Sequence, residues 1–295
     1  MKTSTSKRLR WNVAIWLAAG LFMTGAAGMA SGPIMPDPKA EARHQPQVEE
    51  TANGIPLVNI TAPSSGGVSR NEYETFNVPD KGAILNNSYT LSKTELAGYV
   101  QGNNNMAERP AKIIVNEVTG AGSTSMDGFL EVAGNRADVV IANPNGITVN
   151  GGGFINTGKA FLTTGKPVYD GEDHLQRFDI TGGDILIEGK GLGGKETESL
   201  AILSRAVKIN AGIWAKDLHI TTGTNTVDAK TLEASAIEGK GGCPAFALDT
   251  AAIGGMYAGR ITLVGTEKGL GVNNSGTWSA EDNLTLDWNG DLKNS

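Results

Sequence analysis

The chain has 295 residues, of which 40 are glycine, and aromatic residues make up only 6%. This composition, with its many short β-branched runs, favours strands and turns over long helices, so we expect an all-β protein. The net charge of −6 at pH 7 argues against nucleic acid as a partner, and the single cysteine, Cys243, excludes an internal disulfide.

Residues 1–30 have the features of a secretory signal peptide. Four basic residues within the first ten precede an apolar run over 11–23, and small residues dominate 25–30. The run is too short, and too closely followed by small residues, to predict a membrane-spanning helix. Cleavage after Ala30 would remove four of the 25 basic residues and none of the 31 acidic ones, so the remaining chain would carry a net charge of −10.

The following segment, 31–56, is expected to be a flexible lead-in. It contains five of the eleven prolines, many charges and almost no periodic apolar residues. Ordered structure is therefore expected from Leu57, where strand-like runs alternate with turns. At 92–99, where Ser92 and Glu95 resemble a capping box, we expect a short helical turn or loop rather than a full helix.

The most specific local pattern is the Asn-Pro-Asn-Gly sequence at 143–146, which lies between two strand-like runs. Pro144 fixes φ for a β-turn, and Asn145 and Gly146 tolerate positive φ. The side chain of Asn143 can bond the backbone two residues on, which predicts an Asx turn. Taken alone, the motif could be a tight connection with no further role.

Similar short strands recur in the second half of the chain, at 185–187, 218–220, 261–263 and 284–286. The last two are 23 residues apart, and the pair before them is separated by 43, close to twice that spacing. A period in the low twenties, with strands rather than helices, is typical of a β-solenoid whose coils bury their inward residues by stacking. We predict a right-handed parallel β-helix, with a β-sandwich as the alternative.

At this level of detail the chain resembles the N-terminal two-partner secretion domain, also called the haemagglutination activity domain, of filamentous haemagglutinin and contact-dependent inhibition proteins. The resemblance covers about residues 57–290. The matching text lies at 67–78, 82–88, 95–106, 111–120, 129–147, 151–157, 162–168, 200–218 and 254–272.

The resemblance implies a β-helix over 57–295 with an N-terminal cap and extra-helical strands, running into the start of a filament. It also implies entry into the periplasm through the general secretion machinery and recognition there by periplasmic domains of an outer-membrane transporter, for secretion or cell-surface display. The candidate residues for recognition, or for shaping the recognition segment, are Asn143, Pro144, Asn145, Gly146, Ile147, Asn116, Glu117, Asn103, Asn104, Asn105 and Met106. Both a structural role and direct transporter contact remain open for them.

Two departures from the family pattern stand out. The Asn-Pro-Asn-Leu motif of the family is replaced by the sequence at 103–106, which lacks the proline, so the role of this segment is uncertain from sequence. The Cys-x-x-Cys pair of the cytolysin branch is absent, which argues against a haemolysin.

Enzymatic patterns are weak, and we expect neither catalysis nor a cofactor or metal. The sequence at 189–196 approaches a phosphate-binding loop, but Glu196 replaces the required hydroxyl residue. A secreted carbohydrate-active β-helix enzyme is one alternative, for which the acidic pairs at 172–173 and 281–282 would be the only candidates. A cell- or glycan-binding adhesin module, facing a host or neighbouring cell, is another. The strand at 284–288 suggests an open β-helix edge that would favour self-association.

Overall fold

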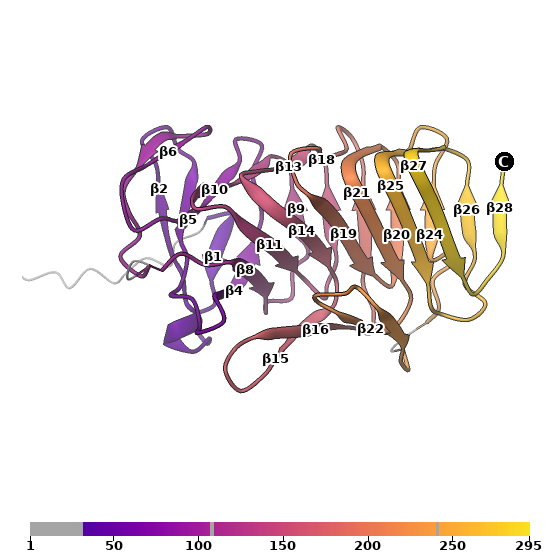
Figure 1. The fold of residues 1–295 in the computed structure, drawn as a ribbon, viewed down its shortest axis with the longest axis horizontal. Helices are drawn as coiled ribbons and strands as arrows, with labels where there is room; N and C mark the ends of the chain where they lie inside the picture. Colours follow the sequence, from indigo (N-terminus) through magenta and orange to yellow (C-terminus); the bar gives the residue numbers. More distant parts are fainter. Residues whose placement is uncertain (1–31, 107–108, 240–241) are drawn as a thin grey trace, which may run out of the picture. The chain divides into compact units, whose positions relative to one another are not determined.

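The computed structural model describes residues 32–106, 109–239 and 242–295 (Figure 1). The predicted signal peptide, 1–30, lies outside them. Within the described residues the regular structure is almost entirely strand, and the one helical element is a 3-10 turn, η1 (Ala42–His44). No helix of this part of the chain is long and apolar enough to cross a membrane.

The strands stack into three parallel ladders, which we call the first, second and third faces. The first face contains β3 (Pro56–Asn59), β5 (Ala83–Asn87), β10 (Phe129–Gly134), β13 (Gly152–Ile155), β18 (Leu192–Gly194) and the first halves of β21 (Gly212–Thr222), β25 (Gly255–Gly265) and β27 (Thr277–Trp288). The second face contains β4 (Val68–Phe76), β8 (Ile113–Val118), β11 (Ala137–Ala142), β14 (Thr157–Thr163), β19 (Ser199–Ser204) and the second halves of the same three long strands.

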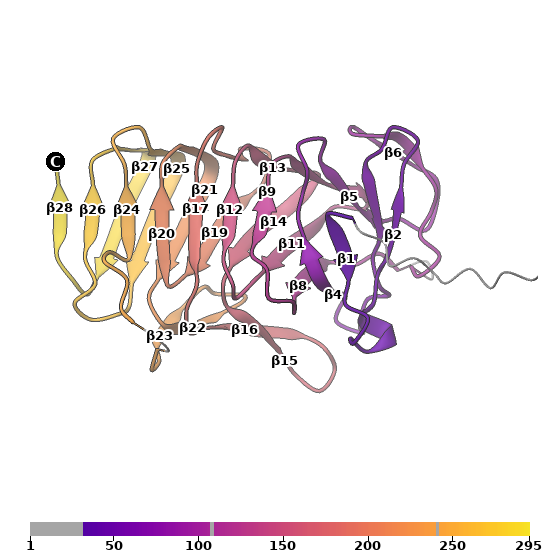
Figure 2. The same cartoon turned by 180° about the vertical axis from the view of Figure 1, so that it is seen from behind.

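The third face is best seen from behind (Figure 2). It contains β9 (Thr124–Met126), β12 (Ile147–Val149), β17 (Asp184–Ile187), β20 (Ala206–Ile209), β24 (Leu248–Thr250), β26 (Val272–Asn274) and β28 (Leu292–Asn294). Because β10, β11 and β12 follow one another along the chain and belong to different faces, one coil visits each face once. The predicted parallel β-helix is confirmed.

The core lies inside the coils and is built by stacking equivalent residues of successive coils. Leu200, Leu218, Ile261 and Leu284 follow one another in direct register, and the first three are fully buried. An inward side chain that lies between two coils is therefore covered on both sides, which is how a solenoid buries apolar surface with short strands, whereas Leu284 of the last described coil is exposed.

The repeat prediction is confirmed for 218–220, 261–263 and 284–286, and wrong in two details. Leu218 and Ile261 are 43 residues apart but belong to adjacent coils, because the described residues 223–239 and 242–247 leave the β-helix between β21 and β24. The strand at 185–187 lies on the third face, whereas the other three lie on the second. The spacing alone could not distinguish an extra coil from an excursion.

Two such excursions build a separate antiparallel sheet that covers the second face. Its strands, in spatial order, are β15 (Lys166–Tyr169), β16 (Leu175–Ile180), β22 (Asn225–Asp228) and β23 (Ala234–Ala236). Phe178 and Val227 of this sheet share a buried cluster with Val140 and Leu203 of the β-helix. The second face is thus apolar on both sides.

A third excursion occupies 92–99, where a short helical turn or loop was expected and no full helix is present. This segment forms a hairpin of β6 (Ser92–Thr94) and β7 (Gly98–Val100). The Thr94 hydroxyl donates to the Gly98 carbonyl oxygen at 2.8 Å, and the Glu131 carboxylate accepts the backbone N–H groups of Glu95 and Leu96 at 2.7 and 2.9 Å. These bonds provide acceptors for the backbone N–H groups of the turn, which in a helix would have been provided by a capping box.

The prediction of a flexible lead-in over 31–56, with order beginning at Leu57, is also wrong. β1 (Ile34–Pro36) pairs antiparallel with β4, and β2 (Gln47–Glu50) pairs antiparallel with β3. Ile34 and His44 are buried. A strand that pairs at a sheet edge through its backbone needs little apolar periodicity and tolerates proline, so composition gave no sign of this cap.

Candidate functional site

The turn at 143–146 is the corner at which the chain passes from β11 to β12. Asn143 accepts both backbone N–H bonds of the turn. Its carbonyl oxygen accepts the Gly146 N–H at 3.1 Å, and its Oδ1 accepts the Asn145 N–H at 2.9 Å. The predicted Asx turn is therefore present. Gly146 has φ of +111°, whereas Asn145 stays at negative φ. Pro144 and Asn145 are exposed.

Asn143 also joins three successive coils. Its side chain is fully buried, and Nδ2 donates to the Gly122 carbonyl oxygen at 2.9 Å and to Thr124 Oγ1 at 3.0 Å in the preceding coil. Its backbone N–H donates to the Thr163 carbonyl oxygen of the next coil at 2.9 Å. The buried Ile147 follows directly and starts β12. The corner therefore sets how adjacent coils stack.

The segment 103–106 forms a second turn with the same bonding, although it lacks proline. Met106 N–H donates to the Asn103 carbonyl oxygen at 3.1 Å, and Asn105 N–H donates to Asn103 Oδ1 at 3.0 Å. Asn103 Nδ2 donates to the carbonyl oxygens of Ile60 and Asn86 at 2.8 and 2.9 Å. Asn103 and Met106 are buried. The turn geometry whose fate was uncertain from sequence is thus retained.

This comparison leads to a prediction for Asn104, which is exposed and occupies the position that Pro144 has in the other turn. No hydrogen bond from its backbone N–H is found within the described residues. Asn104→Pro should therefore stabilise the domain by about 0.5–1 kcal/mol, because it restricts the unfolded chain without breaking a native bond. Urea unfolding measures this, with Asn104→Ala as the control. A destabilised proline variant would show that the two turns differ in backbone conformation.

Asn116 and Glu117 lie on β8 and point to opposite sides of the second face. Asn116 faces the core, where its Oδ1 accepts the Tyr73 hydroxyl at 3.0 Å and its Nδ2 donates to the Val140 carbonyl oxygen at 3.1 Å. Glu117 faces outward and lies beside Arg70, with 3.4 Å between Oε2 and a guanidinium nitrogen. Sequence reasoning grouped the two residues, but the structure gives them separate environments.

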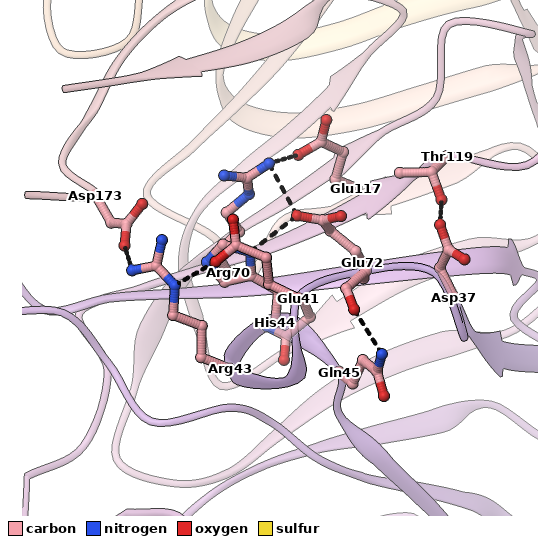
Figure 3. Close-up of polar contacts among 12 residues, drawn as sticks. Asp37, Glu41, Arg43, His44, Gln45, Arg70, Glu72, Glu117, Thr119 and Asp173 are labelled. Atoms are coloured by element: carbon pink, nitrogen blue, oxygen red, sulfur yellow. Dashed lines mark hydrogen bonds and ion pairs between the residues drawn. The ribbon is translucent and has the colours of Figure 1, made fainter. Parts of the chain in front are cut away.

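Glu117 belongs to a group of charged side chains between the cap and the β15–β16 hairpin, which we call the cap cluster (Figure 3). Arg70 contacts Glu72 at 2.8 Å, and Glu72 contacts His44 Nδ1 at 3.0 Å. On the hairpin side, Arg43 of η1 contacts Asp173 at 2.6 Å. The members are Arg43, His44, Arg70, Glu72, Glu117, Tyr169 and Asp173, with the Tyr169 ring 4.4 Å from the Arg70 guanidinium carbon.

Burial dominates the electrostatics of the cap cluster. It raises the pKa of Glu117, an effect that the Arg70 charge partly opposes, and it lowers the pKa of His44, with Arg70 acting in the same direction. Arg70 Nε, Glu117 Oε2 and Tyr169 Oη are buried without a hydrogen-bond partner among the described residues. The Arg70–Glu117 contact is therefore an ion pair without hydrogen-bond geometry.

Only Glu117 of the cap cluster was predicted from sequence. Arg43 and His44 lie in the segment that was expected to be flexible. Asp173 belongs to an acidic pair that was considered for catalysis, but in the structure its carboxylate forms an ion pair with Arg43. The sequence signal that could have indicated the cap cluster was the placement of Arg70 and Glu72 two residues apart, and so on the same side of one strand. No group of three His, Cys, Asp or Glu side chains with a metal-site arrangement occurs in the described part of the chain.

A family model of the TPS secretion domain matches residues 33–294. The chain belongs to this two-partner secretion family. The match includes the cap, so the domain begins well before residue 57. The crystal structure of the filamentous hemagglutinin secretion domain is similar in fold, with a TM-score of 0.75 and 28% identity over 90% of this chain and 100% of that chain.

Curated relatives include the 16S rRNA endonuclease CdiA of Enterobacter cloacae subsp. cloacae, 45% identical over 83% of this chain, and the toxin CdiA of Yersinia pestis, 47% identical over 84%. The chain spans only 8% of the length of each. The endonuclease and toxin names therefore describe proteins far longer than the matched region, and they do not describe the activity of this chain. TPS domains belong to exoproteins that are exported through the periplasm to the cell surface or secreted, and the domain's role is targeting rather than catalysis.

Proposed function

We propose that this chain is the secretion-targeting domain of a large exoprotein of the adhesin or contact-dependent inhibition type, bound in the periplasm by the periplasmic domains of an outer-membrane two-partner secretion transporter. The observation that carries the proposal is the family match over nearly the whole described β-helix, from residue 33 to 294. The predicted signal peptide at 1–30 would bring the chain to the general secretion machinery.

The candidate residues divide into two groups by burial. Asn103, Asn116 and Asn143 are buried and bonded within the β-helix, which supports a structural role. The exposed side chains of the two turns, Asn104 and Pro144 together with Asn145, are available for direct contact. The buried asparagines would therefore shape the corners, and the exposed residues would be the first place to look for transporter contacts.

Binding between the purified domain and the periplasmic domains of its transporter tests the proposal. Titration calorimetry should detect binding that competes with an established two-partner secretion domain of the same transporter, and a secretion assay in a strain with that transporter should show export. The doubly substituted Pro144→Ala, Asn145→Ala chain distinguishes the two roles. It loses the proline and the bond from Asn145 Nδ2 to the Gly120 carbonyl oxygen, so a somewhat lower unfolding midpoint is expected. A loss of affinity measured well below that midpoint, where the chain is fully folded, indicates direct contact. Absence of both binding and export would refute the proposed function.

Cell or glycan binding is a second candidate, supported by aromatic side chains on the outside of the first face. Phe129 and Tyr257 are exposed, and the rings of Trp214 and Tyr257 stack with centroids 6.1 Å apart. Aromatic surfaces of this kind occur at binding sites. Binding of the purified domain to a glycan array would support it. Self-association through the exposed Leu284, Leu286 and Leu292 of β27 and β28 stays a prediction.

A further inference from the structure

The cap covers strand edges at the N-terminal end of two faces. The continuous sheet order runs from β1 and β4 through both faces to β3 and β2, so β1 pairs with the outer edge of β4 and β2 with that of β3. Both pairings are antiparallel, whereas the strands that they cover are otherwise paired in parallel. Without the cap, β3 and β4 would each present a row of unpaired backbone groups, the feature that strand-adding partners use.

The cap contributes little apolar burial of its own. Among the described residues before β3, the buried apolar side chains are Ile34, Pro46 and Ile55. In β2 only Val48 is partly buried. Backbone pairing and the contacts of η1, such as His44 with Glu72, therefore provide most of its attachment. An element attached in this way opens locally at low cost relative to the stacked coils.

A contact from far along the chain holds this cap in place. Arg43 of η1 pairs with Asp173 at the tip of the β15–β16 hairpin, 130 residues later. At the same tip, the Ser64 hydroxyl donates to the Asp173 carbonyl oxygen at 3.4 Å, and the His174 ring packs directly on Gly66. A cavity of about 200 Å³ lies between these segments, so the contact is polar and not close-packed.

We propose that the N-terminal cap is a displaceable cover of the β3 and β4 edges, that the hairpin tip at 170–174 latches it through Arg43, and that the transporter's periplasmic domains bind these edges by strand addition only while the latch is open. This inference rests on the proposed function and names its site and its regulation. Until the chain has folded through residue 174, the edges are accessible. Once the hairpin docks, the cap closes and the transporter loses its site.

Three substitutions open the latch by independent means. Arg43→Gln and Asp173→Asn remove the ion pair, and asparagine tolerates the φ of +58° at position 173. Gly66→Ala acts by size alone, since an added Cβ would lie 1.9 Å from His174 Cδ2 and forces the ring off Gly66, which removes that contact of the hairpin tip. The matched control is Asp179→Asn, which removes the same charge from the same hairpin but breaks only the contact with Arg177, itself on β16.

Hydrogen exchange of the folded domain tests the latch. Amides of 34–50 should exchange about threefold to fivefold faster in the three latch variants, the factor expected for one partly exposed ion pair. Asp179→Asn should leave these rates unchanged, and amides of the stacked coils should not change in any variant. Unchanged cap rates in all three latch variants would overturn the latch.

Calorimetry with the transporter's periplasmic domains tests whether the cap and the transporter compete for the β3 and β4 edges. The latch variants should bind about threefold to fivefold more tightly than the parent chain and the Asp179→Asn control, because the open form is more populated. Faster cap exchange without tighter binding would refute the role of these edges and leave the proposed function standing. If no chain binds, including a variant lacking residues 33–50, the proposed function itself fails.

Discussion

Replacing Asn143 by alanine is expected to destabilise the domain by about 3 kcal/mol and to reduce its secretion through the partner transporter. The substitution removes two hydrogen bonds donated by Nδ2 to the preceding coil and the bond that Oδ1 accepts from the Asn145 N–H, each worth about 1 kcal/mol. It also removes the bond that Oδ1 accepts from Asn145 Nδ2, whose exposed donor can turn to water instead. For a domain of this size, the melting temperature should fall by roughly 6–12 °C. Thermal unfolding and the amount of secreted protein are the two measurements.

Two control variants separate the parts of this effect. Asn143→Asp keeps the Oδ1 acceptor for the Asn145 N–H but puts a buried carboxylate oxygen beside the Gly122 carbonyl oxygen, so it should destabilise the coil contact at least as much as alanine does while the turn bond remains. Asn104→Ala changes an exposed asparagine and should leave the unfolding midpoint almost unchanged. Normal stability and secretion of Asn143→Ala would contradict a role for this corner in export.

The second large effect is expected for Asn116→Ala, at about 2–4 kcal/mol. Asn116 is fully buried, and its removal leaves the Tyr73 hydroxyl in the core without its acceptor. The neighbouring coil also loses the bond to the Val140 carbonyl oxygen. Chemical unfolding of the purified domain measures the loss.

A double-mutant cycle with Tyr73→Phe checks this interpretation. Phenylalanine removes the stranded hydroxyl, so the double variant should be more stable than the sum of the two single effects by about 1–2 kcal/mol. Strict additivity would mean that the Tyr73–Asn116 bond contributes nothing. Glu117→Gln serves as an adjacent control, since its side chain lies on the opposite side of the strand beside Arg70.

The β-helix could be predicted from sequence because apolar residues recur at a regular spacing along the chain. The residues at 218, 261 and 284 are apolar since stacking requires it, and they align in the structure as expected. The Asx turn at Asn143 was equally predictable, since it depends on four adjacent residues. Local rules were sufficient wherever a residue's partners lie in its own turn or at the same place in the next coil.

The cap and the cap cluster escaped prediction for the opposite reason. β1 and β2 are held by backbone pairing at sheet edges, which leaves no apolar period. The contact of Arg43 with Asp173 joins segments 130 residues apart, and nothing near either residue indicates the other. The turn at 103–106 has no proline to mark it in the sequence, and its bonds are accepted by the side chain and the carbonyl oxygen of Asn103.

The excursion after β21 shows that a coil corner can carry a long insertion without changing the register of the stacked coils. Leu218 and Ile261 stay in direct register although the described residues 223–239 and 242–247 between them lie outside the β-helix. The corner between the second and third faces therefore accepts extra sequence without disturbing the stack, as the corner after β14 does for β15 and β16. Such corners are natural grafting points, where a foreign peptide could be displayed on an exported scaffold at little cost to its stability.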